Sequence, residues 1–238
     1  MKKLGVIGGL GPMATAFFMQ MIIEMTDADK DQDHIEMLIH NCPSIPDRTN
    51  YILGKSVENP GRPMAAIGKR LAEIGADVIA IPCITANYFF KELSEEIPIP
   101  IINIIEETAG YLAERNIKEV GLMATDGTVQ SGLFQKALQS AGIDVILPEE
   151  EGQRDVMHLI YQNVKAAYPV EMERFVRVSG ELREKGAKVI LLGCTELSMI
   201  RRDERIGPGY LDAMQVLAKR SVEICGALKK EYQQLITH

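Results

Sequence analysis

Apolar runs alternate with amphipathic segments along the whole chain. The runs "DVIAI" (77–81) and "KVILL" (188–192) are apolar after their first residue, which is typical of parallel strands that helices cover on both faces. Strands that alternate with helices favour an α/β fold with parallel sheets. The predicted strands are 3–8, 34–40, 77–82, 99–103, 118–123, 143–147 and 188–192. The predicted helices are 12–25, 59–74, 86–95, 105–115, 129–141, parts of 152–166, 169–185 and 209–233.

The chain contains an internal repeat. The segments "LAEIGADVIAIPC" (71–83) and "LREKGAKVILLGC" (182–194) share Leu, Glu, Gly, Ala, Val, Ile and a final Cys in register. The segments "KKLGVIGGLGP" (2–12) and "KEVGLMATDGT" (118–128) align in the same order. Similar segments occur in many α/β proteins, but the aligned cysteines favour a true duplication. We therefore predict two similar three-layer α/β domains with mainly parallel sheets, related by a pseudo-twofold axis, with the active site in the cleft between them.

Composition and charge narrow the function classes. The chain has 238 residues, of which 46% are hydrophobic and 25% charged, with a formal net charge of -7 and no basic block. A broad nucleic-acid-binding surface is therefore not expected. No run approaches the roughly 18 apolar residues of a membrane span, and "MKKLGVIGGLG" fits a first strand better than a secretory signal. Four widely spaced cysteines suit a reducing compartment, so we expect a cytoplasmic protein.

Two of these cysteines, Cys83 and Cys194, follow the repeated strands. Ligands of α/β folds bind outside the carboxyl ends of the strands, so facing halves would bring the two thiols to opposite sides of one ligand. A thiolate on one face of a carbon and a thiol on the other can invert its configuration without a metal or an organic cofactor. A free thiol has a pKa of about 8.5, and we expect the helix N-termini to lower it. The alternative interpretation is that both are ordinary buried core cysteines.

These segments together resemble the cofactor-independent aspartate/glutamate racemases of the Asp/Glu/hydantoin racemase superfamily. The resemblance covers essentially the whole chain and rests on "GVIGGLGPMAT", "PSIPDRT", "PCITAN", "GLMATDGTVQSGLF" and "LLGCTEL" in this order. It implies that Cys83 and Cys194 are the catalytic pair, that the substrate is a small acidic amino acid, and that the protein is a homodimer. It also implies a first domain of residues 1–105 plus 208–238 and a second of residues 106–207.

The resemblance also implies substrate-binding residues. Arg48 and Lys165 match basic residues that face the distal carboxylate of the substrate, and a guanidinium can bind a carboxylate in a bidentate manner. Without the resemblance, both would be interpreted as surface residues. The small hydroxyls around the α-carboxylate correspond to Thr85, Thr125 and Thr128, and a tight turn over the ligand corresponds to Gly9 and Gly11.

The turns that carry the cysteines hold further candidates. The family usually reads Cys-Asn-Thr-Ala-His at the first turn, whereas this chain has Ile84 and Asn87 in place of the Asn and the His. Ile84 removes an amide that could hold the α-groups of the amino acid, and Asn87 removes an ionisable imidazole near the first thiol. Both proton carriers remain, which favours a working enzyme with an altered specificity. At the second turn, Glu196, next to Thr195, is expected to orient a thiol or the substrate ammonium, or to cap the following helix.

We predict a racemase that interconverts L- and D-aspartate, or a related acidic amino acid, by proton transfer between two cysteines; the sequence does not choose between aspartate and glutamate. One alternative is a cis–trans isomerase of an unsaturated dicarboxylate that forms a covalent Cys adduct, and another is a non-catalytic acid-binding homologue. "GGLGPMA" also fits a dinucleotide-binding turn, but such a turn predicts an acidic residue near position 41, where the chain has Asn41 and Cys42. No close Cys or His spacing predicts a metal site.

Overall fold

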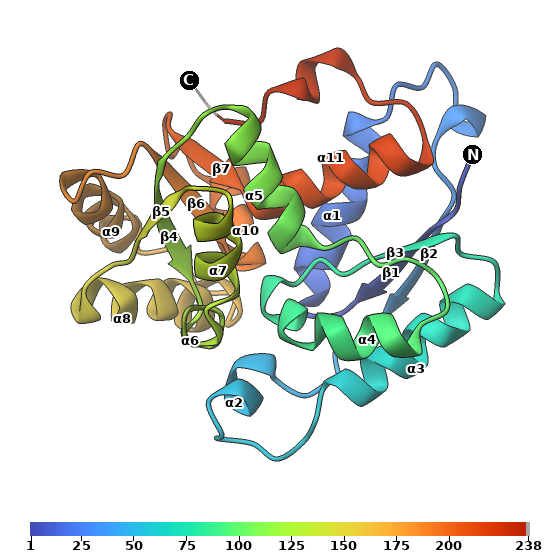
Figure 1. The fold of residues 1–238 in the computed structure, drawn as a ribbon, viewed down its shortest axis with the longest axis horizontal. Helices are drawn as coiled ribbons and strands as arrows, with labels where there is room; N and C mark the ends of the chain where they lie inside the picture. Colours follow the sequence, from blue (N-terminus) through green and yellow to red (C-terminus); the bar gives the residue numbers. More distant parts are fainter. Residues whose placement is uncertain (237–238) are drawn as a thin grey trace.

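The computed structural model describes residues 1–236 as an α/β fold with two sheets of parallel strands (Figure 1). The first sheet has the order β2-β1-β3, with β1 at Leu4–Gly8, β2 at Met37–Asn41 and β3 at Val78–Ala80. The second has the order β5-β4-β6-β7, with β4 at Glu119–Ala124, β5 at Asp144–Ile146, β6 at Val189–Gly193 and β7 at Tyr210–Asp212. The predicted fold class is confirmed. Residues 237–238, the end of the predicted first domain, lie outside the described residues.

The two sheets use the same strand order. β2-β1-β3 corresponds to β5-β4-β6 when each set is read in chain order, and the central strand comes first along the chain in both. This correspondence agrees with the internal repeat, since β1 and β4 belong to one repeated segment and β3 and β6 to the other. The pseudo-twofold axis itself stays a prediction.

Helices and short helical turns connect the strands. In the first half they are α1 Pro12–Met25, the 3₁₀ turn η1 Asp31–Asp33, α2 Arg48–Ile52, α3 Gly61–Glu73, the 3₁₀ segment η2 Ile84–Phe89, α4 Phe90–Glu96 and α5 Ile104–Glu114. In the second half they are α6 Asp126–Ser131, α7 Leu133–Ser140, α8 Glu150–His158, the π-helix η3 Leu159–Val164, α9 Met172–Glu184, α10 Thr195–Asp203, α11 Ala213–Cys225 and the 3₁₀ turn η4 Lys230–Gln233.

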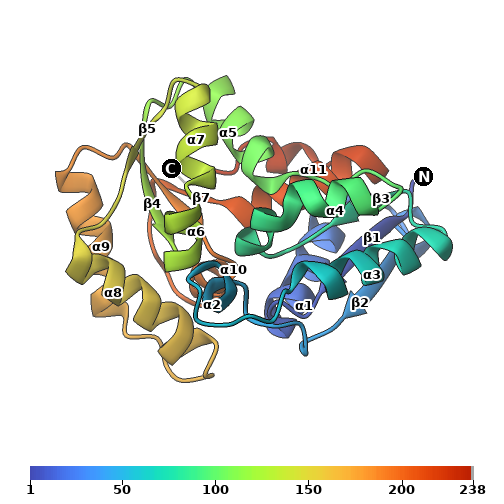
Figure 2. The same cartoon turned by 60° about the horizontal axis from the view of Figure 1, so that its bottom comes forward.

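Each sheet is buried on both faces, which explains the unbroken apolar runs. Val6 of β1 and Leu122 of β4 belong to one large core that α1, α5 and α11 share with both sheets. Their neighbours Ile7 and Met123 point to separate cores, under α3 and α4 in the first case and under α8 and α9 in the second. In Figure 2, α8 and α9 lie beyond β4, on the side away from the first sheet. Successive side chains of a strand therefore enter different cores, and both must be apolar.

Several predicted elements differ in the structure, among them the last helix and the fourth strand. The helix predicted over 209–233 begins instead as β7, and α11 starts only after Asp212, whose side chain accepts a hydrogen bond from the Met214 backbone N–H. The strand predicted over 99–103 is a single parallel bridge between Ile101 and Ile79, because Pro98 and Pro100 have no N–H to donate to a ladder.

The C-terminal segment contacts both halves of the molecule. α11 packs against α1 and α5, whereas β7 pairs with β6 of the second sheet. The predicted domain boundaries, 1–105 plus 208–238 and 106–207, stay a prediction.

Candidate active site

A small cavity lies between the carboxyl ends of the two sheets. Its volume is about 10 Å³, which is room for roughly one water molecule. It is lined by Leu10, Asp47, Arg48, Thr49, Cys83, Ile84, Thr85, Thr125, Lys165, Cys194, Thr195 and Glu196. Eight of the predicted site residues are thus brought together, and an amino acid can enter only if the lining side chains move apart.

The two predicted catalytic cysteines occupy matching positions. Cys83 follows β3 and precedes η2, and Cys194 follows β6 and precedes α10. Both have an extended backbone, with φ of −156° and −149°, and both side chains belong to residues that are only 5% exposed. Neither thiol caps the helix that follows it. The strand ends therefore direct two buried thiols at one cavity.

Cys194 is held as a neutral thiol. Burial raises the pKa of Cys194 well above its usual value, and the nearby Glu196 carboxylate raises it further. The Cys194 Sγ donates a hydrogen bond to Glu196 Oε2 at 2.9 Å, and the Thr195 hydroxyl donates to the same oxygen at 3.3 Å. The expectation that a helix N-terminus lowers the pKa of this thiol is therefore wrong, since desolvation and a neighbouring negative charge outweigh the helix dipole. Glu196 accepts a hydrogen bond from the thiol, which keeps its proton, and does not cap α10 through its side chain.

Arg48 is the first residue of α2 and is buried. Its Nη1 donates to the carbonyl oxygen of Pro46 at 3.0 Å, and its Nη2 donates to that of Leu10 at 3.2 Å. Burial disfavours the charged guanidinium, but Cys83 and Asp47 hold the pKa of Arg48 above its usual value. The Nε atom is buried without a hydrogen-bond partner. A permanent positive charge therefore lies next to the first thiol.

Lys165 follows the π-helix η3 and faces Asp47 of the first half. The Lys165 Nζ lies 3.6 Å from Asp47 Oδ2 and 4.0 Å from the centre of the Tyr161 ring, and the Tyr161 hydroxyl donates to Asp47 Oδ2 at 3.2 Å. Burial lowers the pKa of Lys165, but Glu196 and other neighbours more than offset this, so the pKa is above its usual value. Sequence reasoning missed Asp47 and Tyr161. The only available signal was that Asp47 stands next to Arg48 in "PSIPDRT".

The three predicted threonines form a ring of hydroxyl groups. Thr85 Oγ1 lies 3.1 Å from Thr125 Oγ1 and 3.0 Å from Thr128 Oγ1, and Thr125 donates to Thr128 at 3.1 Å. Thr128 is buried behind the cavity and does not line it. The ring joins η2 of the first half to α6 of the second at the wall of the cavity.

The remaining predicted residues support the cavity from outside. The Asn87 side-chain amide donates to the carbonyl oxygens of Cys83 and Ile84, both at 3.3 Å, so it fixes the first turn. Gly9 has a φ of +91°, and a Cβ there would overlap the backbone of Cys42. A Cβ on Gly11 would lie 3.8 Å from Glu196 Oε1, which puts this turn over the carboxylate.

Comparison with known proteins identifies the family. A profile for Asp/Glu/Hydantoin racemase matches residues 7–220. The chain belongs to this family.

Relatives of this racemase-family protein cover nearly its full length. The broad specificity amino-acid racemase RacX of Bacillus subtilis (strain 168) is 26% identical over 225 residues, which are 92% of this chain and 96% of RacX. The structure of Picrophilus torridus aspartate racemase has a TM-score of 0.84 and 32% identity and covers 98% of both chains. An aspartate racemase homologue from Pyrococcus horikoshii OT3 has a TM-score of 0.75 at 23% identity, covers 94% of this chain and 99% of its own, and shows the shared fold. Family membership and these relatives support an isomerase of the racemase type.

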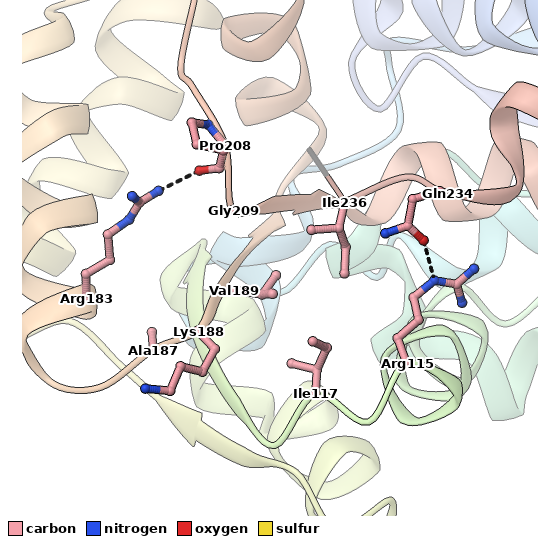
Figure 3. Close-up of a pocket in the computed structure, with 10 residues that line it drawn as sticks. All are labelled: Arg115, Ile117, Arg183, Ala187, Lys188, Val189, Pro208, Gly209, Gln234 and Ile236. Carbon is pink, nitrogen blue, oxygen red and sulfur yellow. Dashed lines mark hydrogen bonds between the residues drawn. The ribbon is translucent and has the colours of Figure 1, made fainter. Parts of the chain in front are cut away.

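A larger hollow of about 740 Å³ lies at the other end of the second sheet, near the amino ends of β4, β6 and β7 (Figure 3). Its floor is apolar, with Ile117, Val189 and Ile236 in the middle of the view. Two of the basic side chains that line it bind the protein itself, since Arg183 donates to the Pro208 carbonyl oxygen and Arg115 to Gln234, and Lys188 is the third. Among the described residues, no cysteine, aspartate or glutamate lines this hollow, so the smaller cavity is the candidate active site.

Neither a metal-binding cluster nor a membrane-spanning helix occurs in residues 1–236. Within that part of the chain, no three His, Cys, Asp or Glu side chains are grouped so that they could hold a metal ion. Among the helices of the same residues, none has both the length and the apolar character needed to cross a membrane.

Proposed function

We propose that this protein racemises aspartate, or a closely related acidic amino acid, by proton transfer between Cys83 and Cys194. The observation that carries the proposal is that two buried thiols from the two repeated strand ends line one cavity together with Arg48 and Lys165. The family and its amino-acid racemase members support the reaction class.

In the proposed reaction, one cysteine acts as a thiolate and the other as a thiol. The thiolate removes the α-proton from one face of the substrate and becomes a thiol, leaving the electron pair on the α-carbon. The opposite thiol gives its proton to the other face and becomes a thiolate. No atom or electron is gained or lost, and exchanging the roles of the two cysteines runs the reaction in reverse.

The substrate class follows from the charges around the cavity. Arg48 and Lys165 are the two cations that line it, and both have a pKa above the usual value, so both stay charged near neutral pH. We assign the distal carboxylate to this pair and the α-carboxylate to the hydroxyls of Thr85 and Thr125. Donors aimed at the α-carboxylate would also stabilise the negative charge that develops when the α-proton leaves.

Deuterium exchange tests the proposal. We would incubate the reduced, metal-free protein with L-aspartate, and separately with L-glutamate, in deuterated water. Deuterium at the α-carbon together with the D-enantiomer is the expected result. Cys83→Ser and Cys194→Ser should each lower racemisation by about 10²–10⁴-fold, while each variant keeps residual exchange of a different enantiomer through its remaining thiol.

Cys42→Ser is the matched control, because Cys42 lies outside the cavity and contacts Ser44. Undiminished racemisation by Cys83→Ser would contradict the proposal. A stable mass adduct with an unsaturated diacid would favour the isomerase alternative, and thermal stabilisation by aspartate without exchange would favour a binding protein. Cofactor independence, the homodimer and the cytoplasmic location stay predictions.

A further inference from the structure

We propose that Glu196 keeps the resting proton on Cys194, so that the unliganded protein holds Cys194 as the acid and Cys83 as the base. The two cysteines are then chemically different although the chain repeat makes their positions alike. The structural part of the proposal concerns the two thiols alone, and its catalytic consequence rests on the function proposed above.

The internal repeat itself carries the difference. Cys83-Ile84-Thr85 aligns with Cys194-Thr195-Glu196, so the second position after the cysteine is a hydroxyl in one half and a carboxylate in the other. Thr85 turns its hydroxyl to Thr125 and Thr128. Glu196 turns its carboxylate to the thiol that precedes it.

The Glu196 carboxylate is enclosed next to Cys194. Its residue is 5% exposed, and Oε2 accepts hydrogen bonds from both the Cys194 thiol and the Thr195 hydroxyl. The turn at Gly11 lies over Oε1. A thiolate at position 194 would face this carboxylate with little solvent between them, and two like charges in such a site repel strongly.

Other charged and polar groups also lie close to the two thiols. Lys165 favours a Cys194 thiolate, but burial and Glu196 outweigh it, and the pKa of Cys194 is raised. Tyr161 lies close enough to Cys194 that a Cys194 thiolate would contribute to raising the pKa of the Tyr161 hydroxyl. On the other side, Arg48 lies next to Cys83 and interacts with Asp47 and Glu196.

The difference has a kinetic signature that a structural role would not produce. The equilibrium constant between two enantiomers is one, so their kcat/KM values must be equal in every active variant. One enantiomer reacts only with enzyme that has a Cys194 thiolate, which is the minor protonation form. Its KM is therefore raised by the inverse of the fraction of enzyme in that form. The ratio of the two KM values therefore reports the position of the proton.

Thiol titration tests the structural part without substrate. Purified protein is treated with iodoacetamide over a range of pH, and the alkylation rates of the Cys83 and Cys194 peptides are followed by mass spectrometry. We expect Cys83 to react with a lower pH midpoint than Cys194. Glu196→Gln should lower the Cys194 midpoint by about one to three pH units and leave that of Cys83 in place.

Glu196→Asp keeps the charge and should restore the original order, and Glu95→Gln, at an exposed site on α4, is the matched control. In the racemisation assay, Glu196→Gln should reduce the KM ratio by about tenfold for each pH unit by which the Cys194 midpoint falls. A wild-type Cys194 midpoint at or below that of Cys83 would overturn the proposal even if Glu196→Gln does not fold. If Cys194 titrates above Cys83 but the protein exchanges no α-proton, the present proposal holds and the proposed function is contradicted.

Discussion

Arg48 directs both of its Nη atoms at backbone carbonyl oxygens. Through Leu10 and Pro46 it ties the turn after β1 to the loop before α2, and its position next to Cys83 follows from these contacts. The residue therefore acts both as a structural clamp and as the fixed positive charge of the site. A planar guanidinium can do this because its donors point in several set directions, which a lysine ammonium cannot reproduce.

Arg48→Lys should impair both roles although it keeps the charge. We expect the free energy of unfolding to fall by about 1–3 kcal/mol, because donors to buried carbonyl oxygens are lost. We expect kcat/KM for aspartate to fall by about 100-fold through misplacement of the cation. Denaturant unfolding and racemisation kinetics measure these effects. Arg70→Lys, exposed near the end of α3, is the control and should change stability by less than about 0.5 kcal/mol. Unchanged kcat/KM in Arg48→Lys would contradict the requirement for a guanidinium at this position.

At the scale of elements, the close contact between α2 and α6 holds the two halves together beside the cavity. α2 begins with Arg48, and α6 carries Gly127 and Thr128 in its first turn. A Cβ on Gly127 would lie 3.0 Å from the Thr49 Cα and 3.1 Å from its Oγ1. The absence of a side chain at Gly127 therefore allows the two helices to approach closely.

Gly127→Ala should push α2 away from α6. Because the nearest atom belongs to the backbone, the strain cannot be relieved by a rotamer change, and we expect a loss of about 1–3 kcal/mol in stability together with reduced racemisation. Gly110→Ala is the matched control, since Gly110 is exposed on α5 and a Cβ there meets nothing within 4 Å. This control should stabilise the protein by about 0.5–1 kcal/mol. Equal effects of the two substitutions on thermal unfolding would contradict the role given to the α2–α6 contact.

At the scale of the whole molecule, Asp47 links the first half to the π-helix segment of the second. Its carboxylate caps α2 through the Asn50 N–H, accepts from Tyr161 and lies opposite Lys165. Burial raises the pKa of Asp47, but the Asn50 N–H, Lys165 and Arg48 more than offset this and hold it below its usual value. The link is therefore present above the usual pKa of an aspartate and is lost as the pH falls through the lowered one. We expect these contacts to close the cleft over the cavity.

Asp47→Asn should remove the charge interaction with Lys165 but keep the cap of α2, because asparagine caps a helix about as well as aspartate. We expect faster amide hydrogen exchange in residues 45–52 and 159–165 and a larger radius of gyration by X-ray scattering. Glu96→Gln is the control, since Glu96 pairs with Lys69 inside the first half, 2.6 Å away, and its loss should affect neither measurement. Unchanged exchange in Asp47→Asn would show that other contacts close the cleft.

The fold class and the location of the two thiols could be predicted from the order of the residues. A strand that faces two cores must be apolar on both sides, so the runs that end before Cys83 and Cys194 predict buried parallel strands directly. The repeat alone assigns both cysteines to equivalent strand ends. Short elements were less predictable. The strand β7 was not predicted because its three residues directly precede α11 and have the same hydrophobic pattern as the first turn of a helix.

The contacts between the side chains of the site could not be predicted, because they join segments that folding brings together. Asp47 and Tyr161 meet across 114 residues of chain, and no periodicity encodes such a contact. The sequence indicated a helix N-terminus behind Cys194 and hence a lowered pKa, whereas the fold buries the thiol and turns Glu196 towards it, which reverses the direction. The sequence pattern predicts which strand end or turn carries a titratable side chain. Its pKa and its partners depend on desolvation and on charges brought close by folding, and these exist only once the two halves have come together.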